Sequence, residues 1–512
     1  MRNIGLLFYF IGFFLSESHS QTIQWQKTFG GSRNEVGNDI LGLSNGNLII
    51  FGSAGSSNGD VIGNHFSPDL DAWLLELDTN QYIISQKCFG GISGEEARSG
   101  LQLTTGKIFM GTADFNDGDV SGVHNSQDIW VVRTDNLNHI LWQHCYGTTA
   151  MDYPYKILST SDGGFIFLGQ YAFGGGDVTC FIGEEDLWLV KIDSVGTIEW
   201  QSCLGSTMGD GGGSIIASQN GGYYVYGGAG AHDGNVNCSG SGTVWLVKLN
   251  SLGSIEWSKC YPSQHGVDLV QSNSGNLFLV AITSSSDLPG YSGGTDYWVY
   301  KTDSLGNIFN SYCYGGSWLD EPSSISLCAD GGVIVSGTTW SNDSLASGNH
   351  GSADAFIVKL DSSCNREWSR CYGGTLDDKA NSIIQTLDGG FIFTGSTKSN
   401  DGDITSTPHG GSDLWVVKIA PTTLSTLELQ NPISQLSSYF ENGKINISFT
   451  STTNGDYLIV LYDQIGRELF SEKLKSNVGV NHYSLDTKIS SGIKILRIQN
   501  SNSSTTIKVF VN

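Results

Sequence analysis

Tryptophan recurs at a near-constant interval through most of the chain, and this recurrence constrains the fold more than any other feature. Eleven of the thirteen tryptophans belong to two columns of a unit that repeats seven times between about residue 22 and residue 420. Neighbouring members of a column lie 53 to 60 residues apart, a spacing typical of a propeller blade or a solenoid turn. The first column is Trp73, Trp130, Trp188, Trp245, Trp298, Phe356 and Trp415, and the second is Trp25, Ser85, Trp142, Trp200, Trp257, Asn310 and Trp368.

Each unit predicts four short antiparallel strands, which we name a to d in chain order. In the copy that starts at Ala380, the β-prone runs 382–386 and 391–395 are joined by Asp388-Gly389. An Asp-Gly pair between such runs indicates a tight hairpin with a type I′ turn. A long polar loop leads to strand c at 413–419, and in complete copies a second tight hairpin joins c to d. Gly395, near the end of strand b, predicts a bulge or a close backbone approach.

The ends of the array distinguish a ring from a solenoid. Residues 22–29 match a d strand with no a, b or c strand before it, and the array finishes at Ile419 with a c strand. In a ring, the N-terminal strand completes the last blade and no sheet edge stays unpaired. A solenoid requires dissimilar capping units instead. The sequence therefore predicts an all-β fold whose residues 21–420 form a seven-bladed β-propeller.

The first twenty residues are typical of a secretory signal peptide. Arg2 precedes an apolar run over 4–15, and the small residues Ser18 and Ser20 predict cleavage near Gln21. The alternative is a membrane anchor, but twelve residues of helix span only about 18 Å of a ~30 Å hydrocarbon core. We therefore expect residues 1–20 to be removed and the protein to be secreted or held at the outer cell surface.

Charge excludes one class of partner. The chain carries 26 basic and 50 acidic residues and a formal net charge of −24, so a nucleic acid backbone would be repelled. This acidity favours solubility and attracts cations, but it selects no substrate.

Six of the ten cysteines form a third column of the repeat. They are Cys88, Cys145, Cys203, Cys260, Cys313 and Cys371. Equivalent positions on neighbouring blades lie beyond the ~7 Å Cα limit for a disulfide, so we interpret the column as a buried, small apolar position. Cys180 and Cys238, in matching loops of adjacent blades, are the predicted disulfide, and Cys364 with Cys371 is a weaker candidate.

The long d–a and b–c loops are expected to share one face, which is where a rigid scaffold presents binding residues. The two tryptophans outside the columns both belong to the sixth unit: Trp318 lies in a d–a loop with Asp320 and Glu321 beside it, and Trp340 ends strand b. An aromatic side chain beside carboxylates suits a sugar or a cation, whereas packing under the loop is the alternative. The third unit has a similar cluster, and its candidate residues are Tyr153 and Tyr155.

The b–c loops also contain acidic turns that are candidates for calcium. Calcium takes six to eight oxygen ligands, and paired aspartates on a glycine-rich turn supply some of them. The alternative is that Asp simply favours turns. The candidate ligands are Asp60, Asp117, Asp119, Asp177, Asp401 and Asp403. The aspartate that opens strand c in six units is interpreted as a loop cap, and the loop histidines His65, His124, His350 and His409 are weak metal candidates.

No catalytic motif is present in the sequence. There is no Gly-x-Ser-x-Gly, no His-Glu-x-x-His and no phosphate-cradling loop. The c–d hairpin, as in Asp193 to Trp200, is superficially similar to the Asp-box of sialidase propellers, but it lacks the Ser-x-Asp-x-Gly order. No catalytic residue is therefore predicted.

Residues 431–512 predict a small β-sandwich after a linker over 421–430. Its landmarks are Asn431-Pro432, Leu461-Tyr462-Asp463, Gly466-Arg467, Leu485-Asp486, Ser491-Gly492-Ile493 and Lys508-Val509. In their order they resemble the C-terminal sorting domain of type IX secretion (type A) in Bacteroidetes-like bacteria, although Ile433 and Lys494 replace the Phe and Tyr usual there. The resemblance implies export across the outer membrane by the type IX machinery, often with removal of the domain. An accessory adhesive sandwich is the alternative.

Three functions remain open at this point. The leading hypothesis is an exported propeller that binds a glycan or a surface protein through its d–a and b–c loop face. The rival is a polysaccharide-active enzyme, a glycoside hydrolase or lyase, with carboxylates near the axis; a glycosidase needs two carboxyl groups about 5–5.5 Å or 6.5–9.5 Å apart. A structural surface protein without a discrete ligand is the third. No cofactor beyond calcium is predicted.

Overall fold

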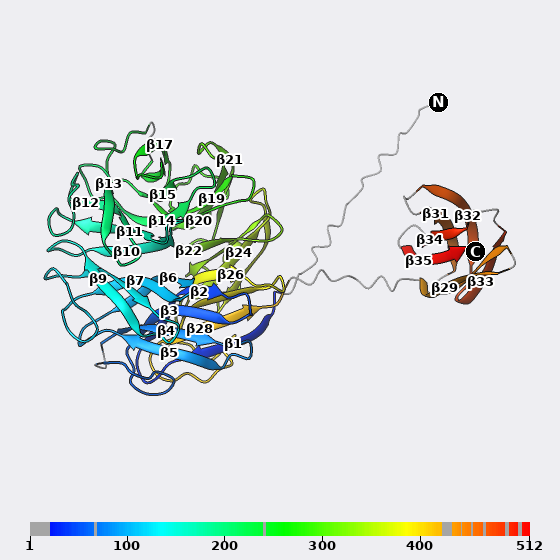
Figure 1. Cartoon of the computed structure of the whole chain (residues 1–512), viewed down its shortest axis with the longest axis horizontal. Helices are drawn as coiled ribbons and strands as arrows, with labels where there is room; N and C mark the ends of the chain where they lie inside the picture. Colours follow the sequence, from blue (N-terminus) through cyan, green and yellow to red (C-terminus); the bar gives the residue numbers. More distant parts are fainter. Residues whose placement is uncertain are drawn as a thin grey trace, which may run out of the picture. The chain divides into compact units, whose positions relative to one another are not determined.

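The structure is a computed structural model in which β-strands carry almost all of the regular structure (Figure 1). It describes residues 21–65, 69–238, 242–421, 433–441, 443–451, 454–463, 467–486, 491–499 and 504–511. Within these ranges the single helical element is the short 3₁₀ turn η1 (Ser344–Ala346). The predicted signal peptide, most of the linker, and the landmarks Asn431, Pro432 and Gly466 lie outside the described residues.

The chain divides into two units, one over Ser20–Thr422 and one that contains Thr423–Asn512. The first unit is a succession of four-stranded antiparallel sheets, as predicted for propeller-like blades. From the a strand outward, the sheets are β2 (Glu35–Gly42), β3 (Leu48–Ala54), β4 (Asp71–Leu77), β5 (Ile83–Phe89); β6 (Glu96–Leu103), β7 (Gly106–Ala113), β8 (Asp128–Thr134), β9 (Ile140–Tyr146); β10 (Tyr153–Ser159), β11 (Phe165–Ala172), β12 (Glu185–Ile192), β13 (Ile198–Leu204); β14 (Gly211–Ala217), β15 (Tyr223–Gly228), β16 (Val244–Leu249), β17 (Ile255–Tyr261); β18 (His265–Gln271), β19 (Leu277–Thr283), β20 (Asp296–Thr302), β21 (Ile308–Tyr314); β22 (Asp320–Leu327), β23 (Val333–Thr339), β24 (Asp354–Leu360), β25 (Arg366–Tyr372); and β26 (Asp378–Gln385), β27 (Phe391–Thr397), β28 (Asp413–Ile419), β1 (Ile23–Phe29).

The last of these sheets joins the two ends of the repeat array. Strand β1 pairs antiparallel with β28, and Ile23 lies opposite Ile419 while Phe29 lies opposite Leu414. Figure 1 shows blue β1 beside yellow-orange β28. The N-terminal strand therefore takes the d position of the last sheet, which is the pairing expected from the ends of the array.

The a–b hairpins differ in detail from the predicted type I′ turn. The Gly389 N–H donates to Thr386 O at 2.9 Å, and Gly389 has a φ of 84°, but Asp388 has no positive φ. The turn is therefore a type I turn closed by a left-handed glycine, the common alternative for a three-residue hairpin loop. The Asp388 carboxylate accepts a hydrogen bond from the Gly390 N–H at 3.0 Å, which fixes the turn from inside.

The predicted irregularity beside Gly395 is confirmed. Strand β26 shifts register between Ala380 and Ser382, and a Cβ on Gly395 would overlap the Lys379 carbonyl. The extra residue of this bulge lies on the a strand, and the same shift occurs between Gly37 and Asp39 in β2. A bulge turns side chains out of the regular alternation of a strand.

The first tryptophan column forms the core between sheets, as predicted. Trp188 is fully buried and packs edge-on against Phe167, with ring centroids 6.0 Å apart and planes at 90°. Its indole N–H donates to Gln201 at 3.1 Å, so the buried polar atom is satisfied. Burial of one such ring stabilises the fold by about 1.5–3 kcal/mol. The second column lies nearer the surface, where the Trp142 indole donates to the Ser194 carbonyl at 3.0 Å.

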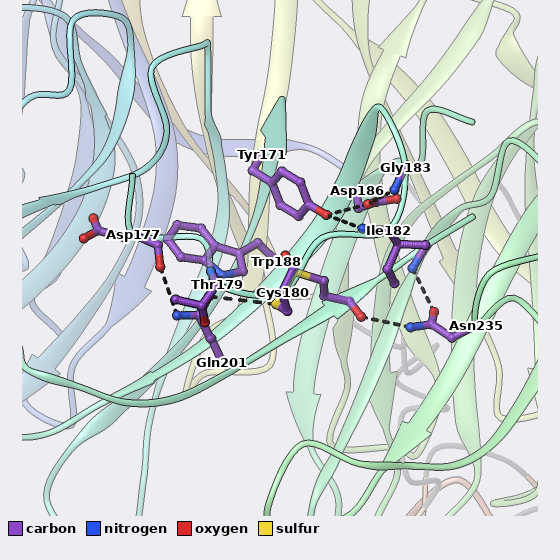
Figure 2. Close-up of a disulfide and its surroundings, with 12 residues drawn as sticks. Tyr171, Asp177, Thr179, Cys180, Ile182, Gly183, Asp186, Trp188, Gln201 and Asn235 are labelled. Carbon is purple, nitrogen blue, oxygen red and sulfur yellow. Dashed lines mark hydrogen bonds between the residues drawn. A yellow bond between two sulfur atoms is a disulfide. The ribbon is translucent and has the colours of Figure 1, made fainter. Parts of the chain in front are cut away.

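The disulfides differ from the prediction. Cys180 pairs with Cys203 and Cys238 pairs with Cys260, with Cα separations of 5.5 and 5.6 Å, so the predicted Cys180–Cys238 bridge is wrong. Each b–c loop folds back over strand d of its own blade: the Gln201 amide bonds the Asp177 carbonyl at 3.0 Å and brings Cys180 opposite Cys203 (Figure 2). The remaining column cysteines are free and buried, as expected, and so are Cys364 and Cys371, so that weaker candidate is also wrong.

The second unit contains two sheets around an apolar core. One is β29 (Ile433–Glu441), β30 (Lys444–Ser451) and β33 (Gly479–Asp486); the other is β32 (Glu468–Ser476), β31 (Gly455–Tyr462), β34 (Gly492–Gln499) and β35 (Ser504–Val511). Ile447, Phe449 and Leu461 are buried between them. The landmark residue Asp463 has a local structural role, since it accepts hydrogen bonds from the Arg467 backbone N–H and guanidinium at 2.9 and 3.1 Å.

Candidate functional site

At six of the junctions where a d–a loop crosses from one blade to the next, two buried acids flank one glycine. One acid opens strand c of a blade, and the other lies at the start of strand a of the following blade. We call these two residues the junction acids. The pairs are Asp71 with Glu95, Asp128 with Asp152, Asp186 with Asp210, Asp296 with Asp320, Asp354 with Asp378, and Asp413 with Glu35.

The junction of the third and fourth sheets shows how the pair is held. The Asp210 carboxylate accepts a hydrogen bond from the Ser206 side chain at 2.9 Å, and the Asp210 N–H donates to the Glu185 carbonyl at 2.6 Å. Asp186 accepts from the Tyr171 hydroxyl at 2.5 Å and the Gly183 N–H at 2.9 Å (Figure 2). The two carboxylates meet at Gly205, where a Cβ would overlap both.

Among the described residues, one oxygen of each c-strand junction acid finds no hydrogen-bond partner. These atoms are Oδ1 of Asp71, Asp128, Asp186, Asp296, Asp354 and Asp413. Burial raises the pKa of Glu95 to about 8 and that of Asp152 to about 7, and the neighbouring acids Asp71 and Asp128 add to the rise. A buried carboxylate beside a like charge prefers to hold a proton. Glu95 and Asp152 therefore favour the protonated form in the folded chain.

The acidic turns predicted to bind calcium bond the chain itself. Asp60 and Asp177 accept the N–H of Gly30 and Gly147, both at 3.2 Å, in the preceding d–a loop. Asp117 accepts from Ile92 and Asp401 from Thr375, at 2.9 and 2.8 Å. Asp403 and Asp119 occupy equivalent turns, and the Asp403 carboxylate lies 3.4 Å from the Gly373 N–H. Five of these carboxylates cap loops, whereas that of Asp119 lies 3.7 Å from His65 Nε2. The single three-ligand cluster found in the described residues contains none of the six.

Four loop histidines bridge aspartates of adjacent blades. His124 Nδ1 lies 2.7 Å from Asp128 and its Nε2 lies 3.7 Å from Asp177. Burial alone would lower the pKa of His124, but the hydrogen bond and charge of Asp128 raise it above its ordinary value. His65, His350 and His409 repeat the arrangement, and the His409 bridge to Asp60 joins the last sheet to the first. These side chains hold blades together rather than converge on one metal ion.

Trp318 lies in the d–a loop before β22, and Trp340 directly follows the last residue of β23. The Trp340 N–H donates to the Leu319 carbonyl at 2.9 Å, and the Trp318 N–H donates to the Ser341 hydroxyl at 2.9 Å. The Trp318 side chain is 67% exposed, whereas Trp340 is half-buried. Of the two, Trp318 presents its indole to solvent.

Two of the other candidate residues differ from the prediction. Asp320 is fully buried and bonds the Thr339 and Ser341 hydroxyls and the Gly316 N–H, so it is a junction acid and is not available to a ligand. Tyr155 donates to Gln170 and accepts from the Gly212 N–H at 2.7 Å, which places it inside the a-strand layer. Glu321 is exposed and Tyr153 is 39% exposed, so these two remain accessible.

Sequence reasoning missed the apolar character of the loop tips. The d–a loops expose large apolar side chains at matching positions close to the junction acid. These residues are Ile92, Met151, Met208, Trp318, Leu319 and Leu376. The signal was present in the sequence, since alignment of the loops on the junction acid places Met208, Trp318 and Leu376 two residues before it.

Polar residues of the a strands line a cavity of about 140 Å³. Lys156 forms an ion pair with Asp268 at 3.1 Å and a hydrogen bond to Ser214 at 3.1 Å. Burial raises the pKa of Asp39, although the Gly100 N–H and the charge of Lys156 oppose the rise. Strands β2, β6, β10, β14, β18, β22 and β26 all contribute to the lining. The sequence did not predict this group of cavity-lining residues, because the alternation of residue types along a strand does not show where a bulge changes the direction of a side chain.

Comparison with known proteins identifies no family. No family model and no curated protein matches the chain. Among solved structures, a tryptophan-to-alanine mutant of Synechocystis apocarotenoid oxygenase is similar, with 14% identity and a TM-score of 0.33 over 57% of this chain. An ACO/RPE65 chimera aligns at 12% identity and a TM-score of 0.32 over 56% of this chain. The chain spans less than two thirds of those proteins, 63% and 62%, and likenesses this low carry no argument about fold or function. In the described residues, no helix is long and apolar enough to cross a bilayer.

Proposed function

We propose that the protein is an exported, closed seven-bladed β-propeller that acts as a binding module through its d–a and b–c loop face. Closure is supported by the β1–β28 pairing and by the Glu35 N–H, which donates to the Ser412 carbonyl at 2.6 Å. The same hydrogen bond, from the second junction acid to the residue before the first, recurs at the other junction-acid pairs, as at Asp210 and Glu185. The axial cavity, lined by seven a strands, supports the same geometry.

The observation that carries the binding proposal is the exposed indole of Trp318. A tryptophan that is 67% exposed on a loop fixed by backbone hydrogen bonds costs little entropy to immobilise and offers a large apolar face. Leu319 beside it and the accessible Glu321 add an apolar and an acidic neighbour. This combination suits a glycan ring or an apolar side chain of a surface protein, and it makes Trp318 the centre of the proposed contact.

Export is proposed on sequence grounds. The N-terminal segment is typical of a signal peptide, and the C-terminal landmarks resemble a type IX sorting domain, so the type IX machinery is the proposed partner for secretion. Deletion of residues 431–512 is expected to retain the protein inside the producing cell. Appearance of the truncated protein in the medium at the level of the full chain would contradict this part of the proposal.

The rival enzymatic function receives less support. The axial cavity of about 140 Å³ is smaller than the roughly 300–1,000 Å³ typical of small-molecule sites. Its carboxylates are already engaged, Asp268 by Lys156 and Asp39 by the Gly100 N–H at 3.1 Å. A sugar unit at the axis would have to break these contacts, so we favour binding at the loop tips.

The binding proposal is tested on the mature chain with a glycan array, a panel of surface proteins and an assay for glycan hydrolysis. Trp318→Ala is expected to weaken any binding at least tenfold without a change in melting temperature. Leu387→Ala is the matched control, because Leu387 is 84% exposed but lies in an a–b turn away from the loop face. Binding that survives Trp318→Ala removes the proposed site, and turnover of a glycan overturns the proposal that the protein is not an enzyme.

A further inference from the structure

Three potential metal ligands meet at the disulfide of the fourth blade, and two of them are the sulfurs of that disulfide. The Sγ atoms of Cys238 and Cys260 and a ring nitrogen of His232 all lie within 4.8 Å of one another. His232 is exposed, and the two cysteines are half-buried. Two thiolates and an imidazole form the donor set that zinc prefers among divalent cations.

The orientation of His232 is an independent indication. Its Nε2 lies 2.9 Å from the Gly242 carbonyl oxygen, and a carbonyl can only accept. Nε2 therefore carries the proton, and Nδ1 is left with the lone pair. A histidine that donates one ring N–H to a backbone carbonyl and binds through its other nitrogen is the arrangement usual for metal-bound histidine.

The third blade provides a comparison within the same chain. Both disulfides, Cys180–Cys203 and Cys238–Cys260, join the b–c loop of a blade to its strand d. Six positions before its loop cysteine, the third blade has Gly174 and the fourth has His232. The bridge alone therefore needs no histidine. The added imidazole distinguishes the fourth blade from the third.

We propose that, after reduction, His232, Cys238 and Cys260 bind one zinc ion, so that this blade has two interchangeable cross-links. A dithiol reductant transfers two electrons and two protons to the Cys238–Cys260 bond: the sulfur–sulfur bond breaks, both cysteines become thiols, and the reductant is oxidised to a disulfide. Zinc then displaces both protons and binds two Sγ atoms and His232 Nδ1, with water as the fourth ligand. The sulfurs must separate from bonding distance to about 3.8 Å, which follows from zinc–sulfur bonds of about 2.3 Å in a tetrahedral site.

The two states exclude each other because the same sulfur atoms are used. In the disulfide state the loop is fixed covalently and no thiolate is available. In the reduced state the metal keeps the loop against strand d. The blade thus retains its loop position when the surrounding medium becomes reducing, and it takes up zinc in exchange.

The test uses the full chain, oxidised or reduced with a phosphine and freed of metal by a chelator. Zinc is titrated against a chromophoric competitor, and cobalt is used to report thiolate ligation by its charge-transfer absorption. The reduced wild type is expected to bind one equivalent that the oxidised protein does not bind. His232→Ala, which leaves the disulfide intact, is expected to weaken this binding at least tenfold and to change the cobalt spectrum.

A double replacement, Cys180→Ser with Cys203→Ser, is the matched control and is expected to keep the zinc equivalent. The pair Cys238→Ser with Cys260→Ser is expected to lose it. Zinc binding that is equal in wild type and His232→Ala, or that persists without Cys238 and Cys260, overturns the proposal. So does a reduced wild type that binds no zinc.

Discussion

Raising the pH from 5 to 7.5 is expected to destabilise the propeller-like unit, and the junction acids determine the sign. The unfolded Glu95 carboxyl loses its proton near its ordinary pKa of 4.5, but in the folded chain burial raises that pKa to about 8. Between these values the folded state holds a proton that the unfolded state has released. The contribution of Glu95 to the free energy of unfolding is therefore fully present below pH 4.5 and is lost as the pH rises through 8.

The magnitude follows from the number of retained protons. For each proton that only the folded state holds, the free energy of unfolding falls by about 1.4 kcal/mol when the pH rises by one unit. Glu95 and Asp152, whose pKa is about 7, are both fully buried, so together they contribute up to about 3 kcal/mol per unit between pH 5.5 and 6.5. Asp128 and Asp354, with pKa values near 6, act in the same direction at the lower end of this window.

The assay is urea unfolding followed by tryptophan fluorescence at constant ionic strength. Glu95→Gln is expected to lower the slope of stability against pH by about one proton, because glutamine is neutral at every pH used. Asp162→Asn is the control: Asp162 lies on an exposed turn, where hydrogen bonds from Thr160 and Lys191 lower its pKa. It is ionised in both states throughout this window. Stability that stays level or rises from pH 5 to 7.5 would refute the reasoning, and so would a Glu95→Gln variant that keeps the full slope.

Further outcomes follow from the packing and the pairing. Gly205→Ala places a methyl group against the Asp186 and Asp210 carboxylates, so a large fall in melting temperature is expected. Gly163→Ala is the control: the space around the position is open, so the variant should lose only the stability that alanine loses at a positive φ. Trp188→Ala is expected to cost about 3–5 kcal/mol of unfolding free energy in urea titrations, because the ring is fully buried. Deletion of residues 21–29 exposes the edge of β28 and is expected to produce concentration-dependent oligomers in light scattering; a monomer as stable as the full chain would contradict the pairing.

The repeating strands were predictable because each hairpin is a local event with its own turn residues. The column of Trp188 and its equivalents recurs in register, and burial of a large ring follows directly. The turn at Asp388 was placed correctly but given the wrong type, since one positive φ suffices when an extra residue is present.

The disulfides and the junction acids could not be derived in the same way. Cys180 meets Cys203 because a loop folds back onto its own blade, and no periodicity records that path. Asp320 looked like a ligand-binding residue because it lies next to Trp318, yet it points into the junction. Trp318 is exposed and Asp320, two residues later in the same irregular loop, is buried. The pattern of residue types does not distinguish the two.

The pairing of β1 with β28 has a kinetic consequence. Ile23 and Ile419 are partners across nearly four hundred residues, and closing a loop of that length costs about 5 kcal/mol of chain entropy before any contact forms. The other blades assemble from neighbouring hairpins at far smaller cost, so the first strand synthesised is the last to find its place. Until it does, β28 has an open edge that the β1 of a second copy fits equally well. Dilution during folding should therefore favour monomers, and crowding should favour strand-exchanged pairs.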